Sequence, residues 1–253
     1  MRCKIAADDY GMSIEINTAI LELINSNVIS KVSVMANDAM EYSIDPDKKI
    51  ETGLHVNLTL CSDRRGEAIS PLNFFYLCFT NEMTTGKIIE SIARQYKALQ
   101  SKKFRISHLD THHHVHIIPK VLNALIIFAK KNAINSIRCF TMDKKFFFLY
   151  LYCLIRFGFI AQVPKMIFLY LVGTIMKSEF DKCKIRYSKN LVIMPLAQKG
   201  DYAALLNELL RRFKDIDAEF VTHPGLIHAI REDKYTAGRK IEYDALKSLN
   251  KQK

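Results

Sequence analysis

Residues 104–131 read FRISHLDTHHHVHIIPKVLNALIIFAKK, and this stretch contains one complete strand–loop–helix unit. Its first apolar run predicts a strand over Arg105–Leu109, and the spacing of apolar residues after Pro119 predicts a helix over Pro119–Lys131. Between them, residues 110–116 hold four histidines and an aspartate, a combination that binds transition metals. The cluster therefore follows the end of a strand, which is where α/β proteins place their chemistry.

Short apolar runs alternate with helical patterns along the rest of the chain as well. Further strands are predicted at Cys3–Ala7, Lys31–Met35, Thr52–Asn57, Ser136–Phe140, Leu191–Met194 and Glu219–Thr222. Further helices are predicted at Ser13–Ser26, Thr84–Ser101, Asp201–Phe213 and Tyr235–Asn250. About seven such units closing on themselves predict a distorted or incomplete (β/α) TIM-like barrel with mainly parallel strands. Because no linker or repeat interrupts the pattern, we expect residues 1–253 to form a single domain.

One apolar helical segment, at about residues 146–177, does not fit the regular alternation. It contains two uncharged runs, Phe146–Ile155 and Met166–Met176, and each is shorter than the roughly 20 apolar residues of a transmembrane helix. A buried helical hairpin is one interpretation of these runs. The alternatives are an exposed lid, a homodimer surface or a surface that rests on a membrane.

The composition limits the classes of protein that the chain can belong to. The formal net charge is +11, but the basic residues are scattered and form no block interleaved with aromatic side chains, so we expect no nucleic acid partner. The six cysteines form no C-x-x-C pair and are typical of buried thiols in a reducing compartment. The N-terminal apolar stretch is too short for a signal peptide, so we expect a cytoplasmic protein.

Three other fragments place polar side chains at predicted strand ends. Asp8 and Asp9 follow the first strand, where a turn of the chain lets both carboxylates point into one pocket. His55 and Asn57 lie on the same face of an alternating strand, opposite its leucine and valine side chains. His223 begins a His-Pro-Gly turn that would hold its imidazole rigidly at another strand end.

These residue types suggest metal-assisted hydrolysis of an amide. Asp9, His55 and His112 would give a divalent ion two imidazoles and one carboxylate while leaving positions open for water, as in catalytic sites. Water bound to that ion would attack the amide carbonyl, with Asp8 as the base and His223 as the acid that protonates the leaving amine. The two imidazoles favour zinc or another transition metal.

The order and spacing of these fragments resemble those of one known family, the YdjC-like carbohydrate deacetylases, which are similar to chitooligosaccharide deacetylases. The matching motifs are Asp8–Ser13, Val32–Asn37, Gly53–Thr59, Ser107–His116, Thr222–Gly225 and Arg239–Leu246. The resemblance implies a distorted barrel enzyme that removes acetyl groups from N-acetylated sugars.

The resemblance also implies roles for individual residues. Asp9, His55 and His112 would be the metal ligands, Asp8 the catalytic base and His223 the acid, and the family's usual ion is Mg²⁺, with Zn²⁺ as the alternative. Further residues are predicted to support the ligands or to contact substrate, and these are Asp110, His114, His116 and Asn57. Either His114 or His116 could also be the acid.

Two alternatives remain open for the function. The apolar segment and the positive charge favour, as one alternative, a lipid-linked N-acetyl sugar as the substrate at a membrane surface. The other is a barrel that binds sugar or metal without turnover, although an unliganded base such as Asp8 has no purpose in such a protein.

Overall fold

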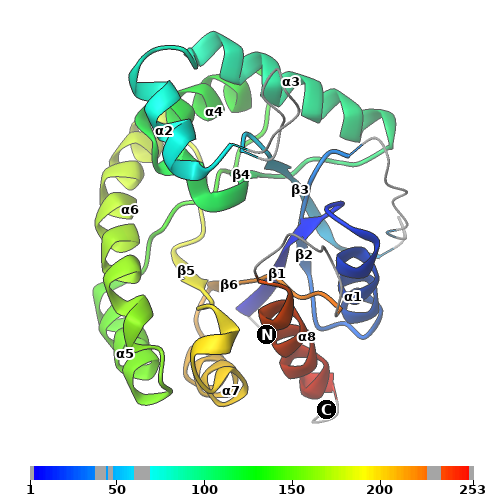
Figure 1. Cartoon of the computed structure of the whole chain (residues 1–253), viewed down its shortest axis with the longest axis vertical. Coiled ribbons are helices and arrows are strands. Elements are labelled where there is room, and N and C mark those ends of the chain that lie inside the picture. Colours follow the sequence, from blue (N-terminus) through cyan, green and yellow to red (C-terminus); the bar gives the residue numbers. More distant parts are fainter. Residues whose placement is uncertain (1–2, 38–43, 45–47, 60–68, 227–234, 251–253) are drawn as a thin grey trace.

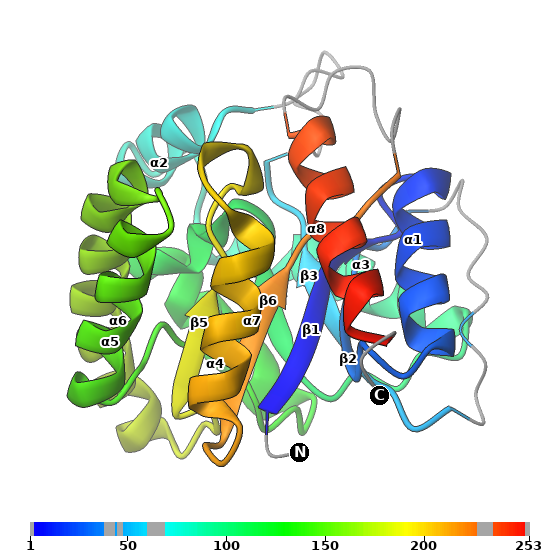
Figure 2. The same cartoon turned by 90° about the horizontal axis from the view of Figure 1, so that it is seen from below.

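In this computed structural model, six parallel strands form one curled sheet in the order β4-β3-β2-β1-β6-β5 (Figures 1 and 2). The structure describes residues 3–37, 44, 48–59, 69–226 and 235–250. The strands are β1 (Cys3–Tyr10), β2 (Lys31–Val34), β3 (Glu51–Val56), β4 (Leu109–Thr111), β5 (Asn190–Ile193) and β6 (Ala218–Thr222). The predicted incomplete TIM-like barrel is confirmed.

Eight α-helices cover the outside of the curled sheet in the described part of the chain (Figures 1 and 2). They are α1 (Ile14–Asn25), α2 (Pro71–Phe79), α3 (Thr85–Ser101), α4 (Pro119–Lys131), α5 (Lys144–Arg156), α6 (Val163–Cys183), α7 (Tyr202–Phe213) and α8 (Thr236–Leu249). The five helices predicted outside the apolar segment agree with α1, α3, α4, α7 and α8 to within about one residue. Helix α2 was not predicted.

Side chains at the N-terminal ends explain where several of these helices begin. The hydroxyl oxygen of Ser13 accepts a hydrogen bond from the Ile16 amide, and Thr84 does the same for Lys87. The Asp201 carboxylate accepts from the amide of Ala204. These caps satisfy amide groups that have no partner inside the helix.

Two strand predictions were wrong, and both concern the side of the barrel between β4 and β5. The strand expected at Arg105–Leu109 instead begins at Leu109, since the ladder with β3 pairs Leu109–Thr111 with Leu54–Val56. The strand expected at Ser136–Phe140 makes only isolated bridges, Leu109 with Ile137 and Ser136 with Arg186. This segment diverges because it crosses from β4 toward β5, where the Thr141 carbonyl accepts from the Leu191 amide. The barrel is therefore incomplete along this seam.

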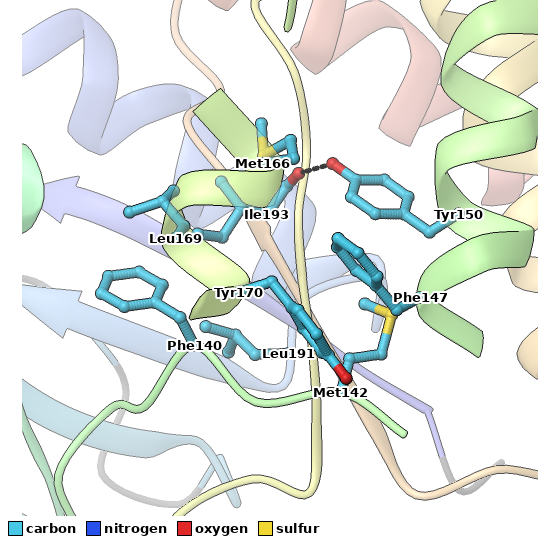
Figure 3. Close-up of a pocket in the computed structure, with 9 residues that line it drawn as sticks. All are labelled: Phe140, Met142, Phe147, Tyr150, Met166, Leu169, Tyr170, Leu191 and Ile193. Carbon is cyan, nitrogen blue, oxygen red and sulfur yellow. Dashed lines mark hydrogen bonds between the residues drawn. The ribbon is translucent and has the colours of Figure 1, made fainter. Parts of the chain in front are cut away.

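The apolar segment forms a helical hairpin of α5 and α6, joined through a 3₁₀ turn, η2 (Ile160–Gln162). The inner side of the hairpin packs on the sheet around a small apolar cavity of about 20 Å³ (Figure 3). There the Tyr150 hydroxyl donates to the Ile193 carbonyl at 2.5 Å, and the rings of Phe147 and Tyr170 stack with their centroids 3.8 Å apart. The interpretation as a buried hairpin is correct only for this inner side, because the outer side is exposed.

The described cysteines are free thiols, and three of them, Cys78, Cys139 and Cys153, are buried. Cys3 and Cys183 are half-buried, so the expectation of buried thiols holds for part of the set. Cys61 lies outside the described residues.

We predict that Gly173→Ala lowers the free energy of unfolding by about 1–3 kcal/mol, because it overpacks the contact between α6 and the segment around Phe140. A Cβ atom at this position would lie 1.9 Å from the carbonyl oxygen of Phe140. Urea unfolding followed by circular dichroism measures the change. The matched control is Gly86→Ala in α3, where the nearest atom to the new Cβ is 3.9 Å away. This control should instead gain about 0.5–1 kcal/mol, and equal stability of the two variants would contradict the prediction.

Candidate metal centre

Both acids at the end of β1 point into the same site, as the sequence predicted. Asp9 has a positive φ of 68°, and the pairing of β1 with β2 shifts register between Ala7 and Tyr10. A regular strand would send two neighbouring side chains to opposite faces, and this irregularity prevents that. The turn that follows is held by Asn17, whose side-chain oxygen accepts from the Gly11 amide at 2.6 Å.

Asp9, His55 and His112 meet at the carboxyl ends of three strands. The Asp9 Oδ1 atom lies 3.0 Å from His112 Nδ1 and 3.3 Å from His55 Nε2. One ligand atom from each residue lies within 4.8 Å of the other two, and all three side chains are buried. The residues predicted as metal ligands are therefore brought together by the fold.

Asp110 orients the His55 ring from behind. Its Oδ1 atom lies 2.6 Å from His55 Nδ1, and its Oδ2 atom accepts from the Ser33 hydroxyl at 2.6 Å. A proton on Nδ1 leaves Nε2 directed at Asp9, which is the carboxylate–histidine–metal arrangement of many metal sites. Burial lowers the pKa of His55, but the nearby charges of Asp110 and Asp8 outweigh it and raise this pKa to about 10. A cation at Nε2 would take the place of that second proton.

Two buried arginines, Arg239 and Arg138, complete the charge balance, and neither was predicted from the sequence as a site residue. Arg239 of α8 donates to Asp9 Oδ2 at 2.7 Å. Burial raises the pKa of Asp9, but the charges of Arg239 and His112 hold that pKa well below its usual range. The sequence feature that could have indicated Arg239 as a site residue is its position in the C-terminal motif, Arg239–Leu246.

Arg138 is the second of these arginines, and it binds Asp8. Its Nη1 and Nη2 atoms donate to the two oxygens of Asp8 at 2.5 and 2.8 Å. Nη2 also lies 2.7 Å from Asp110 Oδ2. A single arginine in a run that otherwise reads as a buried strand, Ser136–Phe140, was the signal for this residue.

His223 follows Thr222, the last residue of β6, and also lies close to Asp8. Its Nε2 atom is 3.8 Å from Asp8 Oδ2, and its side chain is 23% exposed. The turn is held by Glu242, which accepts from the His223 backbone amide at 2.8 Å and from the Tyr202 hydroxyl at 2.9 Å. Among the predicted proton carriers, His223 is therefore the one that combines contact with Asp8 and access to solvent.

After Thr111 the histidine run leaves the extended conformation of β4. Residues His112–Ile117 form a 3₁₀ turn, η1, in which His113 and His114 have positive φ values. The His113 ring turns outward and bonds the Thr59 hydroxyl at 2.9 Å. Strand β4 ends at Thr111, where its ladder with β3 also ends.

His114 and His116 lie against Phe140 and do not join the candidate ligand group, which is Asp9, His55 and His112. The His116 ring stacks on the Phe140 ring with centroids 4.9 Å apart, and its Nδ1 bonds the Thr111 hydroxyl at 2.6 Å. Burial lowers the pKa of His116 to about 3 and also lowers that of His114 well below its usual value. In the described part of the chain, His114 Nδ1 and His116 Nε2 are buried without a hydrogen-bond partner. Both rings are held neutral, which suits acceptance of a hydrogen bond better than donation of a proton.

Asn57 closes the turn after β3. Its side-chain oxygen accepts from the Thr59 amide at 3.2 Å, and its backbone groups bond the Gln95 side chain at 2.8 Å. This is the geometry of an Asx turn. Its predicted contact with ligands or substrate stays a prediction.

The donor set fits a divalent cation. Two imidazoles and one ionised carboxylate converge, the carboxylate is kept ionised by Arg239, and one imidazole is oriented by Asp110. Sites with three protein donors leave positions for water or substrate. The fold and the site thus define a (β/α) barrel protein with a candidate metal centre at the carboxyl ends of its strands.

The chain belongs to the YdjC-like protein family, whose profile matches residues 3–252. It is 29% identical over 147 residues to a carbohydrate deacetylase of Clostridium beijerinckii, an alignment that covers 53% of this chain and 58% of the relative. It is 24% identical over 146 residues to a chitooligosaccharide deacetylase of Salmonella heidelberg, covering 51% and 56%. The chain thus spans less than two thirds of the length of these relatives.

A solved structure from Enterococcus faecalis V583, of a protein named for cellobiose-phosphate cleavage, shares the fold. The TM-score is 0.71 at 16% identity, over 99% of this chain and 92% of the other. At this identity the likeness concerns the fold alone.

We predict that Asp110→Asn weakens binding of a divalent ion by about 10–100-fold, because His55 loses the carboxylate that orients it. Isothermal titration with Zn²⁺ and Mg²⁺ measures the affinity. His113→Ala is the matched control, since it removes a neighbouring imidazole that bonds Thr59. Loss of binding in the control, or unchanged binding in Asp110→Asn, would contradict the ligand set.

Proposed function

We propose that this protein is a metal-dependent hydrolase that removes the acetyl group from an N-acetylated amino sugar, in an oligosaccharide or a glycoconjugate. The observation that carries the proposal is the convergence of Asp9, His55 and His112 beside Asp8 and His223. The names of the relatives, carbohydrate deacetylase and chitooligosaccharide deacetylase, support the same reaction and substrate class.

Asp9, His55 and His112 would hold the ion. Mg²⁺ is the proposed metal, and Zn²⁺ is the alternative that two imidazole donors favour. When bound, the ion supplies a Lewis acid that polarises the amide carbonyl and makes water more acidic.

Asp8 accepts the proton of the attacking water in this proposal. Arg138 grips both of its oxygens, so the carboxylate is held in one orientation and stays within reach of the ligand group. Such fixed geometry contributes to catalysis because no reorganisation is needed when the water approaches.

His223 gives a proton to the leaving amine. Its ring lies at the partly exposed side of the site, 3.8 Å from Asp8, so a proton taken by one group has a short route to the other. The breaking of the carbon–nitrogen bond requires such a donor, because an unprotonated amine anion is a poor leaving group.

The other expectations about partners and location stay predictions. They are the cytoplasmic location, the lack of a nucleic acid partner and the homodimer. A barrel that only binds sugar or metal is less well supported, because Asp8 is placed beside the ligand group without belonging to the Asp9–His55–His112 set.

We expect Asp8→Asn to lower kcat for acetate release by about 10²–10⁴-fold while the ion stays bound, since the base is lost and the ligands remain. The assay would screen N-acetylglucosamine oligomers, nucleotide sugars and lipid-linked N-acetyl sugars with metal add-back. Asp244→Asn, on the exposed side of α8, is the control and should keep full activity. If Asp8→Asn kept its activity, the base would be another group.

Replacement of His223, the proposed acid, should change the kinetics in a different way from replacement of Asp8, the proposed base. For His223→Gln we predict that kcat falls by about 10²-fold or more while KM changes little, because the donor acts only as the bond breaks. A substrate with a better leaving amine should recover most of the lost rate. If the loss were the same for good and poor leaving groups, His223 would not be the acid.

A further inference from the structure

Helix α2 turns its apolar residues outward. Leu72, Phe75, Tyr76 and Phe79 recur at helical spacing along one side, and Leu72 and Phe79 are 76% and 79% exposed. The opposite side, with Phe74 and Cys78, is the one buried against the protein. A helix on the surface of a soluble barrel usually has the reverse pattern.

The outer sides of α5 and α6 continue this pattern. Exposed apolar residues of α5 are Phe148, Tyr152 and Ile155, which are spaced by four and three positions. Those of α6 and the turn before it are Ile160, Ile167, Phe168, Leu171 and Ile175. We call the outward residues of α2, α5 and α6 the apolar face.

Both views place the three helices on the same side of the barrel, away from α1 and α8 (Figures 1 and 2). The inner contacts of the hairpin are already complete around the cavity of Figure 3. The outward side chains are therefore not needed for the packing of the hairpin. A large group of exposed apolar side chains in one region indicates a surface that a lipid bilayer or another molecule covers.

The charges around the apolar face are mostly positive, although Glu82 follows α2 and Asp143 precedes α5. Helices α2 and α5 contain no acidic residue, while Lys144, Lys145 and Arg156 stand at the two ends of α5 and Lys165 in the first turn of α6. The acids of α6, Glu179 and Asp181, are confined to its last turns. The whole chain has a net charge of +11. An apolar surface bordered by cations is complementary to a bilayer with anionic headgroups.

The apolar face adjoins the candidate metal centre. Helix α2 packs against η1, the turn that contains His112, and the Lys120 ammonium bonds Asn81, which lies just after α2. A surface that covers α2 would therefore lie close to the turn that carries His112.

Helix α6 packs along the barrel through its inner side. The helical stretch Ile160–Cys183 has 24 residues and contains an 18-residue window with mean hydropathy 1.3, so by length and composition alone it could span a bilayer. However, Met166, Leu169, Gly173 and Met176 bury its inner side, and Gly173 approaches Phe140 too closely to admit a side chain. Spanning would break these contacts, whereas lying flat on a bilayer uses the exposed side as it is.

We propose that the apolar face docks on the surface of an anionic lipid bilayer and so presents the active site to N-acetyl sugars held at that surface. The second half of this statement rests on the proposed function, but the docking does not.

Sedimentation with lipid vesicles tests the docking directly. The full chain is mixed with vesicles of phosphatidylcholine alone or with about 30% phosphatidylglycerol, and we expect clear pelleting with the anionic vesicles only. Raising the salt from about 0.05 M to about 0.5 M should weaken binding, because it screens the lysine and arginine charges. Protein that stays in the supernatant with anionic vesicles at low salt would overturn the proposal.

A pair of double variants identifies the surface. Phe168→Gln with Leu171→Gln should lower the partition constant by at least about tenfold, because both side chains would enter the interface. The control, Ile14→Gln with Ile241→Gln, changes exposed apolar residues of α1 and α8 and should bind like the wild type. Equal binding by the two double variants would show that another surface contacts the lipid and would overturn the assignment.

The remaining outcome is a second copy of the chain on the apolar face. In that case the wild type would be a dimer by light scattering without lipid, the double variant Phe168→Gln with Leu171→Gln would be a monomer, and the wild type would not bind vesicles. This set of results would overturn the proposal.

Acetate release from a soluble N-acetyl oligosaccharide distinguishes failure of the docking proposal from failure of the proposed function. The variants should leave that activity unchanged, whereas lack of activity in the wild type would count against the proposed function and not against docking.

Discussion

The candidate site depends on the ion pairs of Arg138, which holds two buried carboxylates at once. Its guanidinium binds both oxygens of Asp8 and one of Asp110, and Asp110 in turn orients His55. Removing one partner of a buried ion pair leaves an uncompensated charge, which typically costs about 3–5 kcal/mol. Asp8, the proposed base, and the candidate ligands Asp9, His55 and His112 are therefore not independent parts, since the Arg138 side chain links Asp8 to the Asp110 carboxylate that orients His55.

The motif-bearing part of the site could be predicted from the sequence because each motif lies at the carboxyl end of a strand. Parallel strands bring these ends to one edge of a sheet, so Asp9, His55 and His112 were expected to approach one another even though the bounds predicted for the strand before His112 were wrong. The arginines could not be predicted in the same way. Arg138 and Arg239 reach their partners from positions 130 and 230 residues away, and nothing in local spacing specifies such pairs.

The errors in the fold prediction have a common physical origin. Local apolar runs report burial, but they do not report which backbone groups find ladder partners. Residues 105–108 and 136–140 resemble strands in composition, yet their hydrogen bonds are shared among β3, β4 and the residues before β5. Likewise, the runs within residues 146–177 indicated apolar helices correctly, but only the packing of Gly173 and Tyr150 showed which side of each helix faces the barrel.

The backbone at Asp9 restricts which substitutions could be accepted there. With φ at 68°, this residue occupies the left-handed region, which among residues with side chains aspartate and asparagine tolerate best. The position is therefore constrained twice, by the charge that a cation requires and by the shape of the main chain. Asparagine would satisfy the second constraint and fail the first, while glutamate would satisfy the first and strain the second. Aspartate alone meets both, which makes this residue a more selective marker of an intact site than any of the histidines.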